Sequence, residues 1–285
     1  MNKIIVRPNE TKDCMLSLTD KVIERLLSLG LSIYMDEKYR PFNINGVCFY
    51  SFPPRDADLL IVLGGDGSVI DASVLALELD IPLLGINLGK VGYLATLDPD
   101  EIDMLSVLID GNLTIDEKMI LVAEKQCNDG SIVKSDRFSV NDVIISHDNY
   151  LGLCDIKIEN DRGDWAQYRA DAIILATPAG STAYSLSAGG PIIFHGLDSI
   201  TVTPVCPHSF FNRSIVYGPD EVITVSNMND NLLNISIDGR FFDSLKKGEF
   251  CRIYRSDKRI KMLNLQNTNF FSTLSKKIKL LHDLM

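Results

Sequence analysis

Apolar positions in the first 115 or so residues alternate between two kinds of run. Short runs that are apolar throughout predict buried strands at residues 4–6, 47–50, 59–63 and 82–87. Apolar residues at helical spacing predict helices over residues 18–29, 69–79 and 102–109. Helices between successive buried strands form the βαβ pattern. This part of the chain is therefore predicted to be a Rossmann-like α/β domain with a mostly parallel sheet.

The pattern changes at about residue 117, where short β-prone segments separated by turn residues begin. These segments are residues 121–123, 139–146, 154–158, 172–176, 214–217, 222–225, 233–237 and 250–254. Their spacing predicts an all-β, sandwich-like domain. We therefore predict an α/β domain at 1–116 and a β-sandwich domain at 117–265. Residues 266–285 are expected to end in a helix that packs back onto the first domain.

Composition restricts the classes of partner. The 285 residues are 46% apolar and 23% charged, with a net charge of −10, so nucleic acid and anionic membranes are not expected partners. No apolar run approaches the ~18 residues of a membrane span, and the N-terminal apolar run is too short for a signal peptide. Six scattered cysteines predict free thiols in a reducing cytoplasm, with no disulfide framework and no zinc site.

The segment Gly64-Gly65-Asp66-Gly67-Ser68 directly follows a buried strand and opens a predicted helix. Glycines let backbone N–H groups approach an anion closely, which is typical of a phosphate-binding turn. A carboxylate would repel phosphate, so Asp66 indicates chemistry beside it, as a base for a hydroxyl or as a metal ligand. The chain contains neither a complete P-loop nor the third glycine of a dinucleotide fingerprint.

Two later segments carry further candidate chemistry. Asn141 and Asp142 open a strand, and an amide beside a carboxylate can hold a ribose diol and a base edge, although this pair alone is more typical of a loop end. The small-residue stretch 177–191 follows a buried strand and contains Tyr184, which predicts a helix N-terminus with an aromatic ring for stacking. The stretch 204–208, with one Cys and one His, is interpreted as a structural loop.

In this order the motifs closely resemble those of the NAD kinase family, over nearly the whole chain. The matching stretches are Gly64–Ser68, Gly85–Asn87 through Gly92–Leu94, Asn141–Asp142, Arg169–Asp171 to Pro191, Thr203–His208 with Asn212–Arg213, Asp238–Gly239 and Phe271–Leu274. The resemblance implies a kinase that transfers the γ-phosphoryl group of ATP to the 2′-hydroxyl of the adenosine ribose of NAD, giving NADP. It also implies Mg²⁺ or another divalent cation with ATP, and a homo-oligomer, either dimer or tetramer.

The resemblance also assigns roles to residues. Asp66 would be the catalytic base and would contact NAD together with Gly67. Gly64, Gly65, Gly67 and Ser68 would bind phosphate. Asn141 and Asp142 would hold the adenosine of NAD, Arg169 a phosphate, and Asp171 would face the nicotinamide end, while Asp238 would approach from a neighbouring subunit. The base pocket would be lined by Thr182, Ala183, Tyr184, Ser185, Leu186 and Ser187.

Some residues depart from the family pattern. Asp142 stands where Glu is commoner, Ser68 where Thr or Asn is commoner, and Arg240 where a smaller polar residue is usual. One alternative is a lipid kinase of the diacylglycerol or sphingosine type, which shares the glycine turn but needs an apolar acceptor pocket. A phosphofructokinase would need a basic cluster, and none is evident. A non-catalytic NAD(P)-binding sensor is the remaining alternative, and it would have no need of Asp66.

Overall fold

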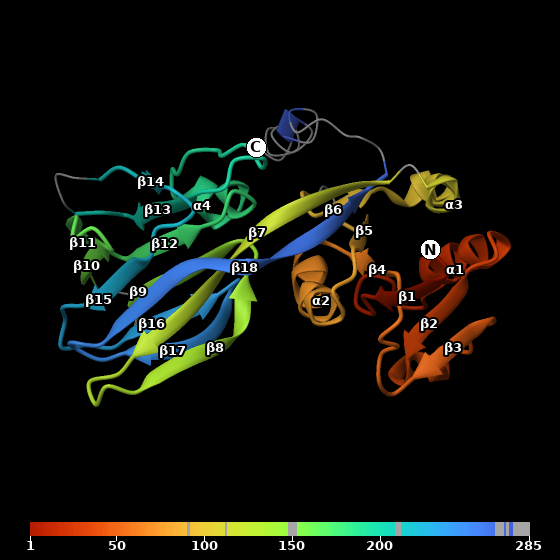
Figure 1. Cartoon of the computed structure of the whole chain (residues 1–285), viewed down its shortest axis with the longest axis horizontal. Coiled ribbons are helices and arrows are strands. Elements are labelled where there is room, and N and C mark those ends of the chain that lie inside the picture. The colour runs from red at the N-terminus through yellow and green to blue at the C-terminus, as the bar shows by residue number, and fades with distance from the viewer. Residues whose placement is uncertain are drawn as a thin grey trace. The chain divides into compact units, whose positions relative to one another are not determined.

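A computed structural model describes residues 1–89, 92–111, 113–147, 153–208 and 212–265, together with 271, 274 and 275. It divides into two compact units (Figure 1). The first holds residues 1–117 and the described residues from Ile260 onward, and the second holds Lys118–Arg259. The predicted domain edge at residue 265 differs from this division, since Met262 pairs with Leu83 of the first unit. Most of the predicted C-terminal helix lies outside the described residues.

The first unit is a parallel sheet in the strand order β3-β2-β1-β4-β5-β6. Its strands are β1 (Lys3–Pro8), β2 (Ser32–Asp36), β3 (Val47–Tyr50), β4 (Leu59–Gly64), β5 (Leu83–Asn87) and β6 (Ala95–Leu97). The helices are α1 (Ser17–Ser28), α2 (Asp66–Leu79) and α3 (Val107–Asp110), with 3-10 helices η1 (Glu37–Phe42) and η2 (Pro99–Ser106). All six positions of β4 are buried, as its unbroken apolar run predicts. The predicted α/β fold is confirmed.

Local signals set the helix ends in this unit. Helix α1 buries Val22, Ile23 and Leu26 and is followed by Gly30, whose φ of +78° is the left-handed conformation that favours glycine. Asp98 and Glu101 form a capping box. That box opens the 3-10 helix η2 rather than the single α-helix that we predicted over 102–109.

The second unit packs two antiparallel sheets face to face. One has the order β11-β10-β15-β18-β7-β8, and the other β14-β13-β12-β9-β16-β17. Their strands are β7 (Thr114–Gln126), β8 (Ile132–Ser139), β9 (Asp142–His147), β10 (Cys154–Asn160), β11 (Trp165–Ala170), β12 (Ala172–Ala176), β13 (Ile200–Val205), β14 (Ile215–Tyr217), β15 (Ile223–Asn227), β16 (Leu233–Ile237), β17 (Arg240–Leu245) and β18 (Phe250–Asn264). Two short helices, η3 (Gly180–Thr182) and α4 (Tyr184–Ser187), follow β12.

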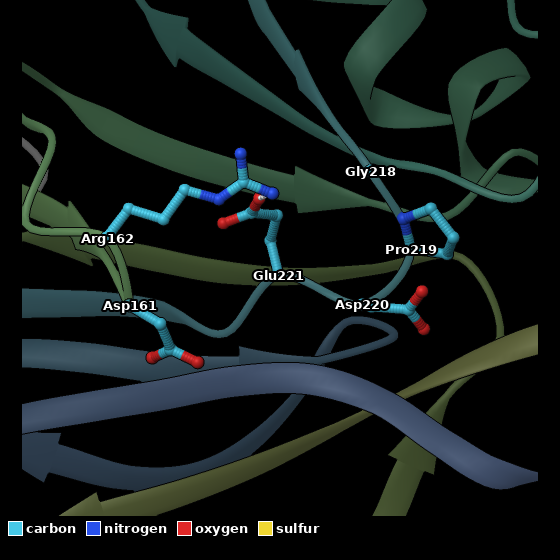
Figure 2. A pocket seen from close by; sticks show the side chains of 6 residues that line it. All are labelled: Asp161, Arg162, Gly218, Pro219, Asp220 and Glu221. Atoms are coloured by element: carbon cyan, nitrogen blue, oxygen red, sulfur yellow. Dashed lines mark ion pairs between the residues drawn. The ribbon is translucent and has the colours of Figure 1, made fainter.

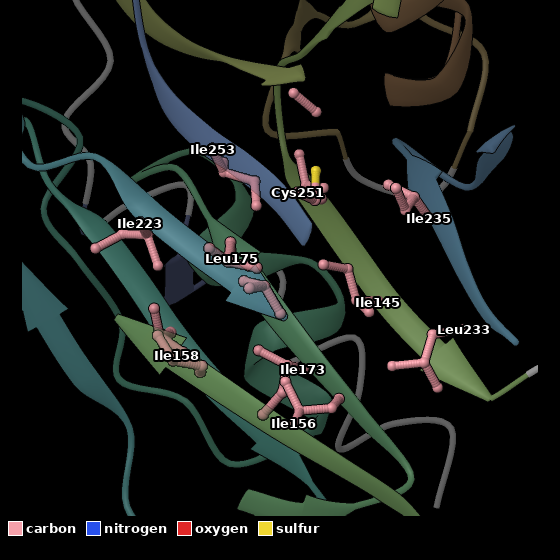
Figure 3. Packing of buried hydrophobic residues seen from close by; sticks show 14 of the residues in the cluster. Ile145, Ile156, Ile158, Ile173, Leu175, Ile223, Leu233, Ile235, Cys251 and Ile253 are labelled. Atoms are coloured by element: carbon pink, nitrogen blue, oxygen red, sulfur yellow. The ribbon is translucent and has the colours of Figure 1, made fainter. Parts of the chain in front are cut away.

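Apolar side chains from both sheets fill the interior of the second unit (Figure 3). Ile145 and Ile173 come from one sheet, while Ile156, Ile223 and Ile253 come from the other, and all five are fully buried. Such alternating inward positions are the core of a β-sandwich. The predicted sandwich is therefore confirmed.

Three predicted strands differ clearly in extent from the structure. The predicted strand 121–123 is a small part of β7, which spans Thr114–Gln126. The predicted strand 139–146 is two strands, β8 and β9, separated at Val140 and Asn141. The N–H groups of both residues donate to the carboxylate of Asp238 instead of to a neighbouring strand, which interrupts the ladder. The predicted strand 250–254 is the first third of β18, which continues to Asn264.

Candidate active site

The glycine turn lies at the carboxyl end of β4, where Asp66 is the first residue of α2. Gly65 occupies the N-cap position with an extended backbone, and no side chain caps the helix there. The first N–H groups of an α-helix have no partner within the helix, and they carry its positive dipole end. The start of α2 can therefore accept an anion such as a phosphate group.

The carboxylate of Asp66 accepts hydrogen bonds from the turn that leads into β6. Oδ2 accepts from the Tyr93 N–H at 3.0 Å, and Oδ1 from the N–H groups of Leu94 and Ala95 at 3.0 and 3.3 Å. These contacts fix the orientation of the side chain, which remains partly exposed. Asp66 is thus a positioned carboxylate that a hydroxyl group can still reach.

Close packing explains Gly64 at this turn and Gly92 in the turn that leads into β6. A β-carbon on Gly64 would lie 2.3 Å from Ser68 Oγ, and one on Gly92 would lie 2.7 Å from Asp66 Oδ1. A β-carbon on Gly65 would meet only the flexible end of Lys12, whose ammonium nitrogen lies 2.7 Å from that position, so packing does not require glycine there. Gly67 is exposed and has open space around it, so its contribution is access for a ligand rather than packing.

Sequence reasoning missed two residues at this turn, Asn9 and Lys12. Both follow β1, which pairs in parallel with β4 as far as Pro8 and Leu63. The Nδ2 of Asn9 donates to Ser68 Oγ at 2.8 Å. The available signal was their position after a buried strand, because the carboxyl ends of neighbouring parallel strands meet at one edge of the sheet.

In the second unit, strand pairing gathers residues that are far apart in sequence. Strand β9 lies between β12 and β16 and is antiparallel to both. The start of β9, at Asn141 and Asp142, therefore lies beside the ends of its two neighbours. Thr177 follows β12, and its N–H donates to the Asn141 carbonyl at 2.9 Å. Asp238 follows β16, and its N–H donates to the Asp142 carbonyl at 3.0 Å.

The carboxylate of Asp238 closes this group within one chain. It accepts hydrogen bonds from Ser139 Oγ and from the N–H groups of Val140, Asn141 and Asp142, at 2.8 to 3.0 Å. The side chain of Asp238 is thus engaged in its own chain, and its approach from a neighbouring subunit stays a prediction. Burial raises the pKa of Asp238, while the four donated hydrogen bonds oppose that rise.

Asp142 is the second carboxylate of the group, and only 4% of it is exposed. Burial, reinforced by the negative charge of Asp238, raises its pKa to about 7. No described residue donates a hydrogen bond to the Asp142 carboxylate; only its backbone groups are bonded. A buried carboxyl group without a donor is suited to bind the hydroxyl groups of a ligand.

The segment after β12 is tightly attached to this group. Thr177 Oγ1 donates to the Val140 carbonyl at 2.6 Å and accepts from the Gly180 N–H at 3.0 Å. A β-carbon on Gly180 would lie 1.9 Å from the Asn141 carbonyl oxygen, so only glycine fits there. The predicted helix N-terminus is in fact two very short helices, η3 and α4.

The predicted base-pocket residues differ in what they can offer a ligand. Tyr184 is 45% exposed, and Ser187 is also exposed, so both side chains are open to a ligand. Ala183 and Leu186 are half-buried. Thr182 is buried, and the hydroxyl of Ser185 is fully buried 3.2 Å from Thr203 Oγ1. The side chain of Ser185 is therefore packed inside the unit, and its contact with ligand stays a prediction.

Arg169 and Asp171 lie at the other end of β12 from Thr177. The six residue steps from Asp171 to Thr177 span roughly 20 Å at the usual rise of a strand. Arg169 lies in β11, where its Nε is 4.0 Å from Asp155 Oδ1. The structure therefore does not bring Arg169 and Asp171 to Asn141 and Asp142, and the two groups can share only a long ligand.

A surface hollow of about 210 Å³ in the second unit lies apart from these residues (Figure 2). It is lined by the turns 161–162 and 218–221, and Arg162 Nη2 is 2.8 Å from Glu221 Oε1 across it. None of the predicted site residues lines this hollow.

Among the described residues, no group of three His, Cys, Asp or Glu side chains is arranged to hold a metal ion. No helix in the described ranges is long and apolar enough to cross a membrane.

The two-domain fold and the glycine turn with its carboxylate define the class of protein as a nucleotide-binding kinase. Comparison with known proteins identifies the kinase family. Residues 3–110 match the ATP-NAD kinase N-terminal domain, and residues 140–265 match the ATP-NAD kinase C-terminal domain. The NAD kinase of Thermoanaerobacter sp. (strain X514) is 33% identical over 98% of this chain and 99% of its own. That of Caldicellulosiruptor saccharolyticus is 38% identical over 78% of this chain and 82% of its own.

Solved structures share the fold. Yeast NADH kinase in complex with NADH superimposes with a TM-score of 0.84 and 21% identity, covering 96% of this chain and 86% of that one. An NAD kinase from Archaeoglobus fulgidus in complex with ATP gives a TM-score of 0.72 and 20% identity, covering 97% and 99%. The chain belongs to the NAD kinase family.

Proposed function

We propose that this chain transfers the γ-phosphoryl group of ATP to the 2′-hydroxyl of the adenosine ribose of NAD, giving NADP and ADP. The observation that carries the proposal is Asp66, held by three N–H groups at a glycine turn in a member of the NAD kinase family. The lipid kinase alternative is not favoured, because the matched domains and relatives are NAD kinases.

Asp66 accepts the proton of the ribose hydroxyl group as the hydroxyl oxygen attacks the γ-phosphorus of ATP. The bond between that phosphorus and the β–γ bridging oxygen breaks, and ADP leaves. A ribose hydroxyl is a poor nucleophile, so a positioned base accelerates the attack. The N–H groups at the start of α2, with Gly64, Gly65, Gly67 and Ser68, stabilise the charge on the transferring group.

The second unit supplies the acceptor site. Asn141 and Asp142 bind the adenosine ribose and base edge, and the exposed ring of Tyr184 stacks on the adenine, beside Ala183 and Ser187. Arg169 and Asp171 bind a part of the dinucleotide far from the adenosine. Their position at the opposite end of β12 from Asn141 supports this assignment. Asp238 acts by holding the backbone at Asn141 and Asp142.

A divalent cation, Mg²⁺ or another, is part of the proposal as a component of the donor. Because the described residues contain no three-ligand group, the phosphates of ATP would carry most of its coordination. Asp66 is the one carboxylate at the turn. The cation supplies charge neutralisation on the phosphates when bound.

The cellular setting belongs to the same proposal. We infer a cytoplasmic homo-oligomer, dimer or tetramer, with NAD and ATP as its ligands. The scattered cysteines and the acidic net charge support this setting. In this proposal the α/β domain predicted at 1–116 carries the donor chemistry, and the β-sandwich domain predicted at 117–265 binds the acceptor. Light scattering on the purified protein tests the oligomeric state.

The deciding experiment measures NADP formed from NAD, ATP and Mg²⁺ by the wild type and by Asp66→Asn. We expect turnover in the wild type and a loss of ~10² or more in kcat for the variant, because the amide cannot accept the proton. Asp20→Asn, an exposed aspartate on α1, is the matched control. Dinucleotide binding without turnover in the wild type would instead identify a sensor.

A further inference from the structure

The ammonium group of Lys12 lies beside the glycine turn, and no acidic side chain among the described residues pairs with it. Its nitrogen lies 2.7 Å from the position that a β-carbon on Gly65 would occupy, and 3.6 Å from the corresponding position on Gly89. Gly65 and Gly89 follow β4 and β5, which are neighbouring parallel strands paired up to Gly64 and Asn87. The charge is thus placed between two glycine-containing turns at one edge of the sheet.

Nearby carboxylates are engaged elsewhere. Glu10 lies 3.6 Å from Lys38. Asp13 accepts from the N–H and the hydroxyl of Thr19, at 2.9 and 2.8 Å. Within the described ranges, the Lys12 side chain has no ion pair and no hydrogen bond. The chain as a whole carries a net charge of −10 and repels anions. The positive charge of Lys12 at this turn can offset that repulsion locally.

Asn9 explains why Lys12 lies there. Its Oδ1 accepts from the N–H groups of Thr11 and Lys12, at 3.1 and 3.2 Å, which forms a tight turn after β1. Its Nδ2 donates to Ser68 Oγ at 2.8 Å in the first turns of α2. One asparagine therefore ties the Lys12 backbone to the helix that begins with Asp66.

We propose that Lys12 is a binding residue for the polyphosphate of the donor nucleotide, placed by Asn9. This deepens the proposed function and rests on it. The ammonium would form charge-assisted hydrogen bonds to phosphate oxygens that also meet the N–H groups at the start of α2. A compact point charge on a flexible stem suits phosphates whose charge moves during transfer. The acceptor dinucleotide makes no contact with Lys12 in this proposal.

The test compares Lys12→Met and Lys12→Gln with Lys12→Arg, and uses Lys21→Met as control, because Lys21 is an exposed lysine on α1. For Lys12→Met and Lys12→Gln we expect the KM for ATP to rise about tenfold or more, since charged hydrogen bonds are lost. The KM for NAD should change by less than about twofold, and Lys12→Arg should retain most of the affinity for ATP. Lys21→Met should match the wild type.

Calorimetric titration of each protein with ATP, and separately with inorganic tripolyphosphate, measures donor binding without turnover. Weaker binding of both probes by Lys12→Met and Lys12→Gln supports the proposal. Unchanged binding of both probes overturns it, and so does a KM for NAD that rises more than the KM for ATP. A wild type that binds ATP but makes no NADP refutes the proposed reaction, and the titration then still decides the role of Lys12.

Discussion

Replacing Asp142 by Asn is expected to stabilise the second unit at pH 8 and to have a much smaller effect at pH 5. Asp142 is 4% exposed, and its pKa is raised from 3.8 to about 7, first by burial and then by the charge of Asp238. An isosteric amide keeps the shape of the side chain and cannot ionise. The variant therefore removes the cost of holding a buried charge next to a second carboxylate.

The sign and size of the effect follow from proton linkage. A carboxyl group whose folded pKa is above its unfolded pKa contributes stability that is fully present below pH ~4 and lost as the pH rises through about 7. A rise of about three pKa units corresponds to ~4 kcal/mol in the free energy of unfolding. About two of those units, or ~3 kcal/mol, are lost between pH 5 and pH 8.

The assay is urea unfolding of wild type and Asp142→Asn from pH 5 to pH 8. Circular dichroism follows the unfolding, because Trp165, the one tryptophan of the chain, is already 65% exposed in β11. The wild type should lose stability relative to the variant as the pH rises, by ~3 kcal/mol over this range. Asp136→Asn, an exposed position in β8, should follow the wild type at every pH.

The same titration should appear in substrate binding. If an ionised Asp142 accepts hydrogen bonds from the ribose, the wild-type KM for NAD should fall as the pH rises through about 7. In Asp142→Asn this pH dependence should be absent.

The urea unfolding assay also has a result that would refute this reasoning. If the unfolding curves of wild type and Asp142→Asn shift in parallel between pH 5 and pH 8, the assignment of a protonated carboxyl group to Asp142 is wrong.

Two further predictions concern close packing and buried charge in the second unit. Gly180→Ala should destabilise this unit by ~3 kcal/mol or more and weaken NAD binding, because its β-carbon would lie 1.9 Å from the Asn141 carbonyl oxygen; Gly218→Ala, with open space around it, should have little effect on the unfolding midpoint. Lys125→Met should cost ~3–5 kcal/mol, because it leaves Glu249, whose side chain is 5% exposed, without its partner at 3.3 Å. Adding Glu249→Gln should recover part of that loss, and equal unfolding midpoints for the single and double variants would contradict this account.

Much of the site in the first unit could be predicted from local sequence. A run of apolar residues ending in Gly64–Ser68 specifies a buried strand, a glycine turn and a helix start within about ten residues. The structure has these elements at β4 and α2. The α/β and β-sandwich classes were predictable for the same reason, since hydrophobic periodicity is a local property.

The tertiary neighbours of Asp66 and of the glycine turn around it could not be predicted in this way. Its N–H donors come from residues 93–95, beyond the next strand, and Lys12 comes from the turn after β1, more than fifty residues earlier. Only the parallel order β1-β4-β5 brings these segments to one edge.

The acceptor site depends even more on tertiary structure. The sequence by itself determined the residue types at Asn141, Asp142 and Asp238 and the strands that carry them. It did not reveal that the Asp238 carboxylate binds the N–H groups of residues 140–142, or that Asp142 is buried beside it. The antiparallel placement of β9 between β12 and β16 decided both. The physical reason is that burial and charge proximity set a pKa, and both arise only when distant strands pair.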